Sequence, residues 1–191
     1  MKKNEEYIVT CIDDTDLNSG VVKIDDMVVF VPNLLIGEKA KIKIVKVNKK
    51  YAFGIITQLL KPSINRQELT CEVAKTCGGC QLQHMKYAYQ LDYKYKHVKK
   101  LFEDIEVKSI LGMDSPWYYR NKAQFPVKIK DGKVLMGFYR QHSNDVVTCK
   151  ECKIQDFTIN KIFGFIQKHI TIEHSQTSQV LYLTTTHEMT T

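Results

Sequence analysis

Four of the six cysteines are spaced in a way that suits a metal centre. Cys71, Cys77 and Cys80 form the run C-x5-C-G-G-C, and Cys152 follows much later in the chain. Thiolates are the usual ligands of iron–sulfur clusters, with three often supplied by one tight loop and the fourth by a distant segment. The paired glycines fit such a loop, because glycine lets the backbone turn sharply and approach a bound group closely.

Two other interpretations of these cysteines remain open. The pairs Cys77-x2-Cys80 and Cys149-x2-Cys152 could form a tetrahedral four-cysteine zinc site. Far more residues separate the two pairs than the roughly 15–20 of a zinc ribbon, and this grouping leaves Cys71 unused. In the third interpretation, some of the cysteines are buried small apolar residues, which is common.

The composition is that of a globular protein with an excess of positive charge. The 191 residues are 43% hydrophobic and 26% charged, and the formal net charge is +7. No stretch reaches the ~18 apolar residues that cross a bilayer, and the N-terminal M-K-K-N-E-E-Y leads into a strand pattern and not into a signal core. We therefore expect a cytoplasmic monomer with reduced thiols, no membrane association and a polyanionic partner.

Residues 1–61 show short β-type segments separated by turns. Strands are expected at 7–12, 21–24, 27–31, 41–47 and 51–60, with Cys11 as a core residue of the first. Five short strands in this space are typical of a small OB-like β-barrel, and such barrels often bind nucleic acid. The expected nucleic-acid face comprises Lys41, Lys43, Lys46, Lys49, Lys50 and Tyr51. Alternatively, these lysines only keep an exposed sheet soluble.

Residues 62–70 are the expected linker between the barrel and the cysteine loop. After the cysteine loop, the spacing of apolar residues becomes helical. Tyr87, Leu91, Tyr95, Val98 and Phe102 fall on one helical face. An apolar stripe of this spacing predicts a helix that packs against a core.

The remaining segments predict mixed α and β structure. Asp131-Gly132, between two β-type runs at 117–130 and 134–147, is a strong hairpin signal. Asp156 is expected to cap an amphipathic helix that ends near His169. Residues 171–191 are rich in Thr and Ser, with one β-like run at 180–183.

With these elements placed, the chain resembles the RNA uracil-5-methyltransferases that carry an iron–sulfur cluster and act on 23S ribosomal RNA. The most specific match is the cysteine loop, and the likeness covers roughly residues 7 to 168. The matching motifs are V-F-V-P-N-L-L-I-G-E (29–38), P-S-I-N-R (62–66), C-x5-C-G-G-C-Q-L-Q-H (71–84), Y-x2-Q-L-x2-K (87–94), Y-R-N-K (119–122), G-F-Y-R (137–140) and S-N-D-V-V-x4-C-K-I (143–154).

The resemblance implies a particular fold class and domain order. It implies an α+β protein in which a five-stranded OB-like TRAM barrel at 1–61 and a linker at 62–70 precede an iron–sulfur-bearing α+β central domain at 71–170. The tail at 171–191 has no assigned structure. By this likeness Cys71, Cys77, Cys80 and Cys152 hold a [4Fe–4S] cluster, and Arg120 and Lys122 join the barrel lysines in binding ribosomal RNA. Bracing of the central sheet is the alternative role of Arg120 and Lys122.

The chain departs from the family at its C-terminal end. Members of the family continue into a Rossmann-like domain that binds S-adenosylmethionine and supplies the nucleophilic cysteine and the general base. No Gly-rich fingerprint of a nucleotide-type cofactor site is present here, and no residue is expected to be catalytic. We therefore expect a transferase by resemblance whose catalytic domain is absent, so that this chain alone transfers no methyl group. The alternative is a stand-alone iron–sulfur module that binds RNA or senses redox state.

Overall fold

The computed structural model describes residues 1–102, 104–171 and 179–185. They form two compact units, of which unit 1 comprises Met1–Glu68 and Gln81–Leu111, and unit 2 comprises Leu69–Cys80 and Gly112–Thr191. This division differs from the expected sequential domains, because the segment after the cysteine loop belongs to unit 1. Neither described helix combines the length and the hydropathy that crossing a membrane requires.

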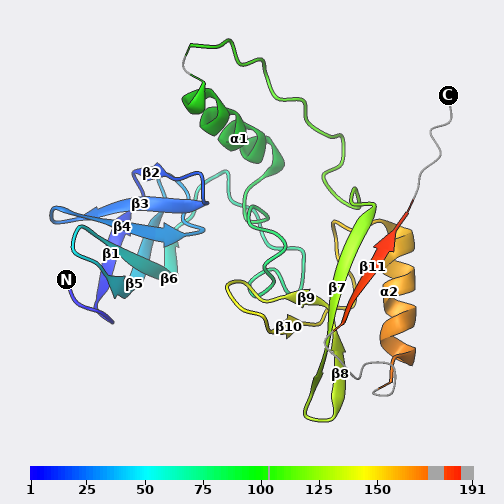
Figure 1. The fold of residues 1–191 in the computed structure, drawn as a ribbon. Coiled ribbons are helices and arrows are strands. Elements are labelled where there is room, and N and C mark those ends of the chain that lie inside the picture. The colour runs from blue at the N-terminus through cyan, green and yellow to red at the C-terminus, as the bar shows by residue number, and fades with distance from the viewer. Residues whose placement is uncertain (103, 172–178, 186–191) are drawn as a thin grey trace. The chain divides into compact units, whose positions relative to one another are not determined.

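Unit 1 is built on a mixed six-stranded sheet in the order β1-β5-β6-β4-β3-β2 (Figure 1). Its strands are β1 (Glu6–Thr10), β2 (Asp13–Asp14), β3 (Ser19–Ile24), β4 (Met27–Pro32), β5 (Lys39–Val47) and β6 (Tyr51–Lys61). Neighbouring strands are antiparallel, except that β4 and β6 are parallel. The five strands expected from the sequence are all present, and the two-residue β2 is additional.

The sheet curls around one apolar core. Val9 of β1 and Val22 of β3 lie near opposite ends of the strand order, yet they belong to the same buried cluster. The predicted alternation in β5 is confirmed, since Ile42 and Ile44 are completely buried in this cluster. Cys11 is buried with them, as expected, but it lies just after β1, which ends at Thr10, and not within the strand.

A buried carboxylate joins the sheet to the segment that follows it. Glu38 is 0% exposed, and it accepts the backbone N–H groups of Leu35 at 2.9 Å and Ser63 at 3.0 Å. The Nε and Nη2 atoms of Arg66 each donate to one of its oxygens at 2.6 Å. Burial raises the pKa of Glu38, but the Arg66 guanidinium and the two N–H groups outweigh burial and hold that pKa below its usual range. The start of the expected linker is therefore fixed to the sheet.

Helix α1 (Tyr87–Leu101) packs within unit 1 through a tyrosine and a histidine. Tyr93 is buried, and its hydroxyl accepts the backbone N–H of Asn18 at 3.0 Å and donates to the carbonyl of Thr15. The His97 ring lies edge-on to Tyr93, with 4.5 Å between centroids, and its Nε2 is 3.0 Å from the Asp14 carboxylate. These contacts fix α1 beside β2 and the loop that follows it.

The expected packing stripe of α1 is wrong at its C-terminal end. Val98 is 43% exposed and Phe102, just after the helix, is 48% exposed. The buried face is instead the neighbouring one, which carries Tyr89, Tyr93 and His97 at steps of four. A tyrosine is suited to this position because its ring packs against the core while its hydroxyl satisfies buried backbone groups.

Unit 2 contains a three-stranded antiparallel sheet in the order β11-β7-β8 and a two-stranded one, β10-β9. The strands are β7 (Lys122–Lys130), β8 (Lys133–Met136), β9 (Phe138–Tyr139), β10 (Val146–Val147) and β11 (Gln179–Thr184). The predicted hairpin at Asp131-Gly132 is confirmed. Both residues have positive φ, at 51° and 71°, and Lys130 pairs with Lys133, as a two-residue turn between twisted strands requires.

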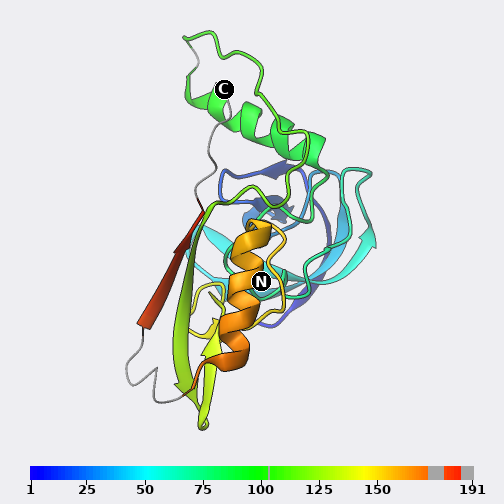
Figure 2. The ribbon, with the colours of Figure 1, turned by 90° about the vertical axis from the view of Figure 1, so that its right-hand side faces the viewer.

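Helix α2 (Phe157–His169) lies along one face of the three-stranded sheet (Figure 2). The predicted cap is confirmed, because the Asp156 side chain accepts the backbone N–H of Thr158 at 2.7 Å. Phe163 is completely buried and stacks on Phe125 of β7 with 4.3 Å between ring centroids. Both units combine helix with sheet, which confirms the α+β fold class.

Replacing Glu38 by glutamine should lower the free energy of unfolding of unit 1 by about 3 kcal/mol, because the largely buried Arg66 guanidinium loses its charged partner. The pKa of Glu38 is lowered in the folded state. The stability that Glu38 contributes is therefore complete above the ordinary pKa of a glutamic acid, and it is lost as the pH falls through the lowered pKa. Glu38→Gln should flatten this acid-side loss of stability. Hydrogen exchange of the β5 amides at a series of pH values measures both effects within unit 1.

Glu68→Gln is the matched control, because Glu68 is exposed and belongs to the same unit. It should leave the exchange of the β5 amides unchanged. Equal losses of protection in both variants would contradict a special role for the buried carboxylate.

Candidate functional site

The cysteine loop of unit 2 is held against the strand β9. The Cys77 N–H donates to the Val73 carbonyl at 2.8 Å, and Cys77 forms an isolated antiparallel bridge with Arg140. On either side of this bridge, the Gly78 N–H donates to the Tyr139 carbonyl and the Gln141 N–H donates to the Thr76 carbonyl, each at 2.9 Å. The loop therefore adds a short stretch of strand-like pairing to the end of β9.

The two glycines of the loop have separate roles. A Cβ atom on Gly78 would lie 3.3 Å from the Tyr139 carbonyl oxygen and from the Cα of Gln141, which is tighter than ordinary packing allows. The Gly79 N–H points to the Cys77 sulfur at 3.3 Å. The close approach expected of Gly78 is thus made to a neighbouring strand, while Gly79 donates to a cysteine sulfur.

The distant cysteine is fixed by helix α2. The Cys152 N–H donates to the Asn160 Oδ1 at 2.9 Å, and the Asn160 Nδ2 donates to the carbonyls of Cys152 at 3.0 Å and Gln155 at 2.9 Å. The Glu72 carboxylate also accepts the Lys150 N–H at 2.8 Å, which ties the cysteine loop to the segment that carries Cys152. The structure therefore brings both parts of the predicted ligand set into one unit.

The thiols of this region interact electrostatically. Burial raises the pKa of Cys77, and the charge of Cys71 raises it further. Burial also raises the pKa of Cys152, with contributions from Cys71 and Cys77. Cys71, Cys77, Cys80 and Cys152 are all half-buried.

Cys149 belongs to the core and not to this group. It is buried in the apolar cluster of unit 2 that includes Phe125 and Phe163. Burial raises its pKa to about 12, with smaller contributions from the neighbouring cysteines. A zinc site made of two C-x2-C pairs requires Cys149 as a ligand, so its place in the core does not favour that interpretation. Burial likewise raises the pKa of Cys11 to about 11, and neither thiol is suited to nucleophilic attack.

The predicted ligands are thiols, whose chemistry suits an iron–sulfur cluster. Among the described residues, no three His, Cys, Asp or Glu side chains converge closely enough to hold one metal ion. The assignment of a [4Fe–4S] cluster to Cys71, Cys77, Cys80 and Cys152 therefore stays a prediction. Half-buried thiols and an N–H donor to the Cys77 sulfur are the groups that hold and tune such a cluster.

The predicted basic residues occupy different environments. Lys41 forms an ion pair with Glu6 on β1 at 2.6 Å, so its charge is partly neutralised. Lys43 is half-buried on the same outward face of β5, while Lys46, Lys49 and Lys50 are exposed. A register shift between Ile44 and Lys46 interrupts the alternation of buried and outward-facing residues at the end of β5.

Arg120 and Lys122 lie in unit 2, where their side chains are exposed. The Arg120 backbone joins the segment before β7 to the start of α2, because its N–H donates to the Ile154 carbonyl and its carbonyl accepts the Asp156 N–H. Lys122 begins β7 and pairs with Thr184 of β11. The backbones of Arg120 and Lys122 therefore take part in the fold of unit 2, while their charged side-chain groups remain accessible.

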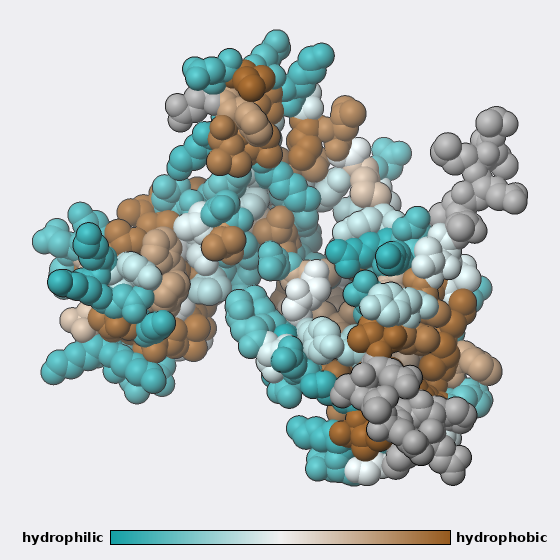
Figure 3. Space-filling view, in the orientation of Figure 1, coloured by the Kyte–Doolittle hydropathy of each residue, from teal (hydrophilic) through white to brown (hydrophobic). Residues whose placement is uncertain are grey.

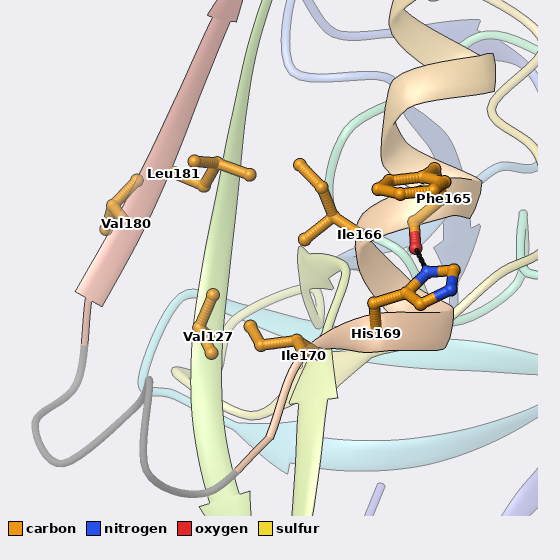
Figure 4. A pocket seen from close by; sticks show the side chains of 7 residues that line it. All are labelled: Val127, Phe165, Ile166, His169, Ile170, Val180 and Leu181. Atoms are coloured by element: carbon orange, nitrogen blue, oxygen red, sulfur yellow. Dashed lines mark hydrogen bonds between the residues drawn. The ribbon is translucent and has the colours of Figure 1, made fainter.

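Among the hollows formed by the described residues, two lie in unit 2. One, of about 450 Å³, is lined by Val127, Phe165, Ile166, His169, Ile170, Val180 and Leu181 (Figure 4). Its one imidazole, of His169, has Nδ1 2.8 Å from the Phe165 carbonyl, and the other lining side chains offer no acid or base. The other, of about 490 Å³, lies beside the cysteine region and is lined by Glu72, Val73, Thr148, Cys149, Lys150 and Gln167.

Residues 3–57 match the family model of the TRAM domain. Unit 1 thus contains a TRAM domain. Over 89% of its length the chain is 39% identical to an uncharacterized RNA methyltransferase of Clostridium tetani. Over 88% of its length it is 43% identical to another from Oceanobacillus iheyensis. It covers 38% of each of these proteins, so it spans about two fifths of the length of the curated relatives it matches.

A solved structure shows the same relationship. The chain superimposes on the crystal structure of Pyrococcus abyssi tRNA (uracil-54, C5)-methyltransferase in complex with S-adenosyl-L-homocysteine, with a TM-score of 0.57 and 25% sequence identity. The match covers 84% of this chain and 37% of that one. The chain is therefore related to RNA methyltransferases across most of its length, including residues outside the TRAM domain.

Replacing Asn160 by alanine should lower the free energy of unfolding of unit 2 by about 1–3 kcal/mol, because the backbone of Cys152 loses its partners in a partly buried place. Trp117 is the single tryptophan of the chain and lies in unit 2, so its fluorescence during urea unfolding follows this unit. Lys161→Ala, at the next and exposed position of α2, is the control and should change little. An Asn160→Ala variant as stable as this control would show that the Cys152 backbone is held by other contacts.

Proposed function

We propose that this chain is the RNA-binding and cluster-bearing part of an RNA (uracil-C5) methyltransferase that acts on 23S ribosomal RNA. In this proposal Cys71, Cys77, Cys80 and Cys152 hold a [4Fe–4S] cluster. The barrel lysines and the pair Arg120 and Lys122 bind RNA phosphates, and S-adenosylmethionine is the methyl donor of the whole protein.

The observation that carries the proposal is the extent of the similarity to RNA methyltransferases. Identities of 39% and 43% run through 89% and 88% of the chain, which includes parts of both units. The Pyrococcus abyssi relative is named as a uracil C5 enzyme and was crystallised with S-adenosyl-L-homocysteine, which is S-adenosylmethionine after loss of its methyl group. The choice of ribosomal RNA rests on the motif resemblance, and the absence of methyl transfer by this chain alone stays a prediction, as does a cytoplasmic location.

The cluster is proposed as a structural staple of unit 2. The loop that contains Cys71, Cys77 and Cys80 and the segment around Cys152 are already joined by the Glu72–Lys150 hydrogen bond. When bound, the cluster supplies covalent cross-links between these two segments. The residues of this chain position its ligands, with β9 orienting the loop and Asn160 orienting Cys152.

RNA binding is proposed on electrostatic grounds. The chain carries a formal net charge of +7, and Lys46, Lys49 and Lys50 are exposed together at the end of the β5–β6 hairpin. Three such charges near one another attract a phosphate backbone and release its counterions. Lys41 is expected to contribute less, because Glu6 competes for its ammonium group.

Anaerobically purified protein should contain about four irons per chain and absorb broadly in the visible range. Cys152→Ser should lose or destabilise the cluster because it removes one of four ligands. Cys149→Ala is the matched control three residues away, and it should keep its iron because Cys149 lies in the apolar core. Metal analysis and absorption spectra check both variants.

Stoichiometric zinc without iron would overturn the cluster assignment. A cluster that is lost in air while the circular dichroism of the protein stays unchanged would instead favour the redox-sensing alternative. A structural staple should be protected from air, and its loss should unfold unit 2.

Replacing Lys46, Lys49 and Lys50 together by glutamate should weaken binding to a ribosomal RNA stem-loop strongly. For single-stranded segments, each phosphate that the variant no longer neutralises should reduce the slope of log affinity against log salt by about 0.7. Titrations at several salt concentrations provide the measurement. The matched control replaces Lys130, Lys133 and Lys161 of unit 2 together by glutamate, because these exposed lysines are not among the proposed RNA-binding residues and the net charge changes equally. Unchanged affinity of the triple variant would mean that this surface only keeps the sheet soluble.

A further inference from the structure

Three aromatic side chains lie together on the outer face of the TRAM domain. Phe30 of β4 and Phe53 of β6 are register partners, and Tyr51 lies two residues before Phe53 on the same side of β6. Their ring centroids are 5.8 Å apart for Phe30 and Tyr51, 5.9 Å for Phe30 and Phe53, and 5.5 Å for Tyr51 and Phe53. We call these three residues the aromatic cluster.

The aromatic cluster does not belong to the apolar core. Its residues alternate along their strands with the buried Val29, Val31 and Ala52, so they point away from the core. None of the three is among the residues that pack against that core, and Tyr51 is 40% exposed. The interplanar angles of 67°, 42° and 87° show that no two of the rings stack face to face. Ring surface therefore remains for another planar group.

Lysines surround the aromatic cluster. Lys46 is the register partner of Phe53, and Lys49 and Lys50 directly precede Tyr51 in a turn closed by the Asn48 N–H and the Tyr51 carbonyl at 2.9 Å. On the other side, Lys23 of β3 is paired with Val28, the residue two before Phe30. Figure 3 shows hydrophilic and hydrophobic residues side by side on the face of the sheet of unit 1 that is turned to the viewer.

We propose that the aromatic cluster is a base-stacking platform that makes the TRAM domain bind single-stranded RNA in preference to duplex. This inference rests on the proposed function for RNA binding and adds to it the structural class of RNA that is bound. Aromatic rings stack on bases that are unpaired and splayed, and flanking lysines hold the phosphates on either side. The bases of a duplex are already stacked on one another and cannot reach the rings.

Only part of this surface was predicted from the sequence. Tyr51 was expected beside the lysines because it follows them in the chain. Phe30 and Phe53 have no such signal, since phenylalanines in a short β-strand are ordinarily core residues. Their outward position follows from the strand register, which pairs Phe30 with Phe53 across the parallel β4–β6 ladder.

The test compares an intact single-stranded oligoribonucleotide of about ten nucleotides with one of the same length that carries abasic positions. Both have the same backbone charge, and only the first has bases to stack. Tyr51→Leu should weaken binding to the intact strand roughly 5- to 150-fold, which is the cost of losing stacking with one base. The same variant should bind the abasic strand as the unchanged protein does, and its salt slope should stay constant because the lysines still hold the phosphates.

Two further variants separate stacking from folding. Tyr51→Trp keeps an aromatic ring and should retain affinity for the intact strand. Ile55→Ala removes an exposed apolar side chain from the same face of β6 and should leave the affinity unchanged. Circular dichroism shows that each variant is folded, and Phe53→Leu should weaken binding as Tyr51→Leu does.

The outcomes distinguish this inference from the function on which it rests. If the lysine variants weaken binding while Tyr51→Leu and Phe53→Leu do not, RNA binding stands and the stacking platform is wrong. If neither set of variants changes affinity, the proposed RNA-binding surface fails and the inference fails with it. Binding to a duplex as tight as to the single strand would also overturn it.

Discussion

The buried carboxylate of Glu38 is the constraint on which the arrangement of unit 1 depends. A carboxylate that leaves water is tolerated only when its oxygens are fully hydrogen-bonded and its charge is balanced. Glu38 meets both conditions through donors from Leu35, Ser63 and Arg66, and a second bond from the Arg66 Nη2 to the Asn33 carbonyl fixes the guanidinium. The chain after β6 must therefore return to the turn before β5. This return fixes residues 63–66 within unit 1.

Local signals in the sequence predicted the elements that depend on local physics. The hairpin at Asp131-Gly132 follows from the positive φ that both turn residues adopt, and the start of α2 follows from the side chain of Asp156. The helix α1 was placed correctly, but its buried face was not. Tyrosines occupy two adjoining faces of this helix, and the choice between them depends on Asn18 and Thr15, more than seventy residues away.

In the candidate sites, too, the sequence did not predict the contacts between segments that are far apart in the chain. Spacing and the family resemblance select Cys71, Cys77, Cys80 and Cys152 as ligands, and this selection stays a prediction. Spacing could not show that Gly78 approaches β9 or that Asn160 holds Cys152, because these contacts depend on how the folded segments meet. The ion pair between Lys41 and Glu6 depends on the pairing of β1 with β5. A run of lysines in one strand carries no information about which of their charges is neutralised by a neighbouring strand.

The discontinuous course of the chain has a consequence for synthesis on the ribosome. The polypeptide leaves unit 1 after Glu68, supplies unit 2 with the segment up to Cys80, returns to unit 1 until Leu111, and only then completes unit 2. Cys152 is therefore made about seventy residues after Cys80, a delay of roughly 4–15 s at ordinary elongation rates. Throughout this interval α2 (Phe157–His169) has not yet been made, and β9 (Phe138–Tyr139) is made only late in it. The nascent chain thus passes through a stage in which the thiols of the cysteine loop lack these folding partners, and the speed of translation sets how long that stage lasts.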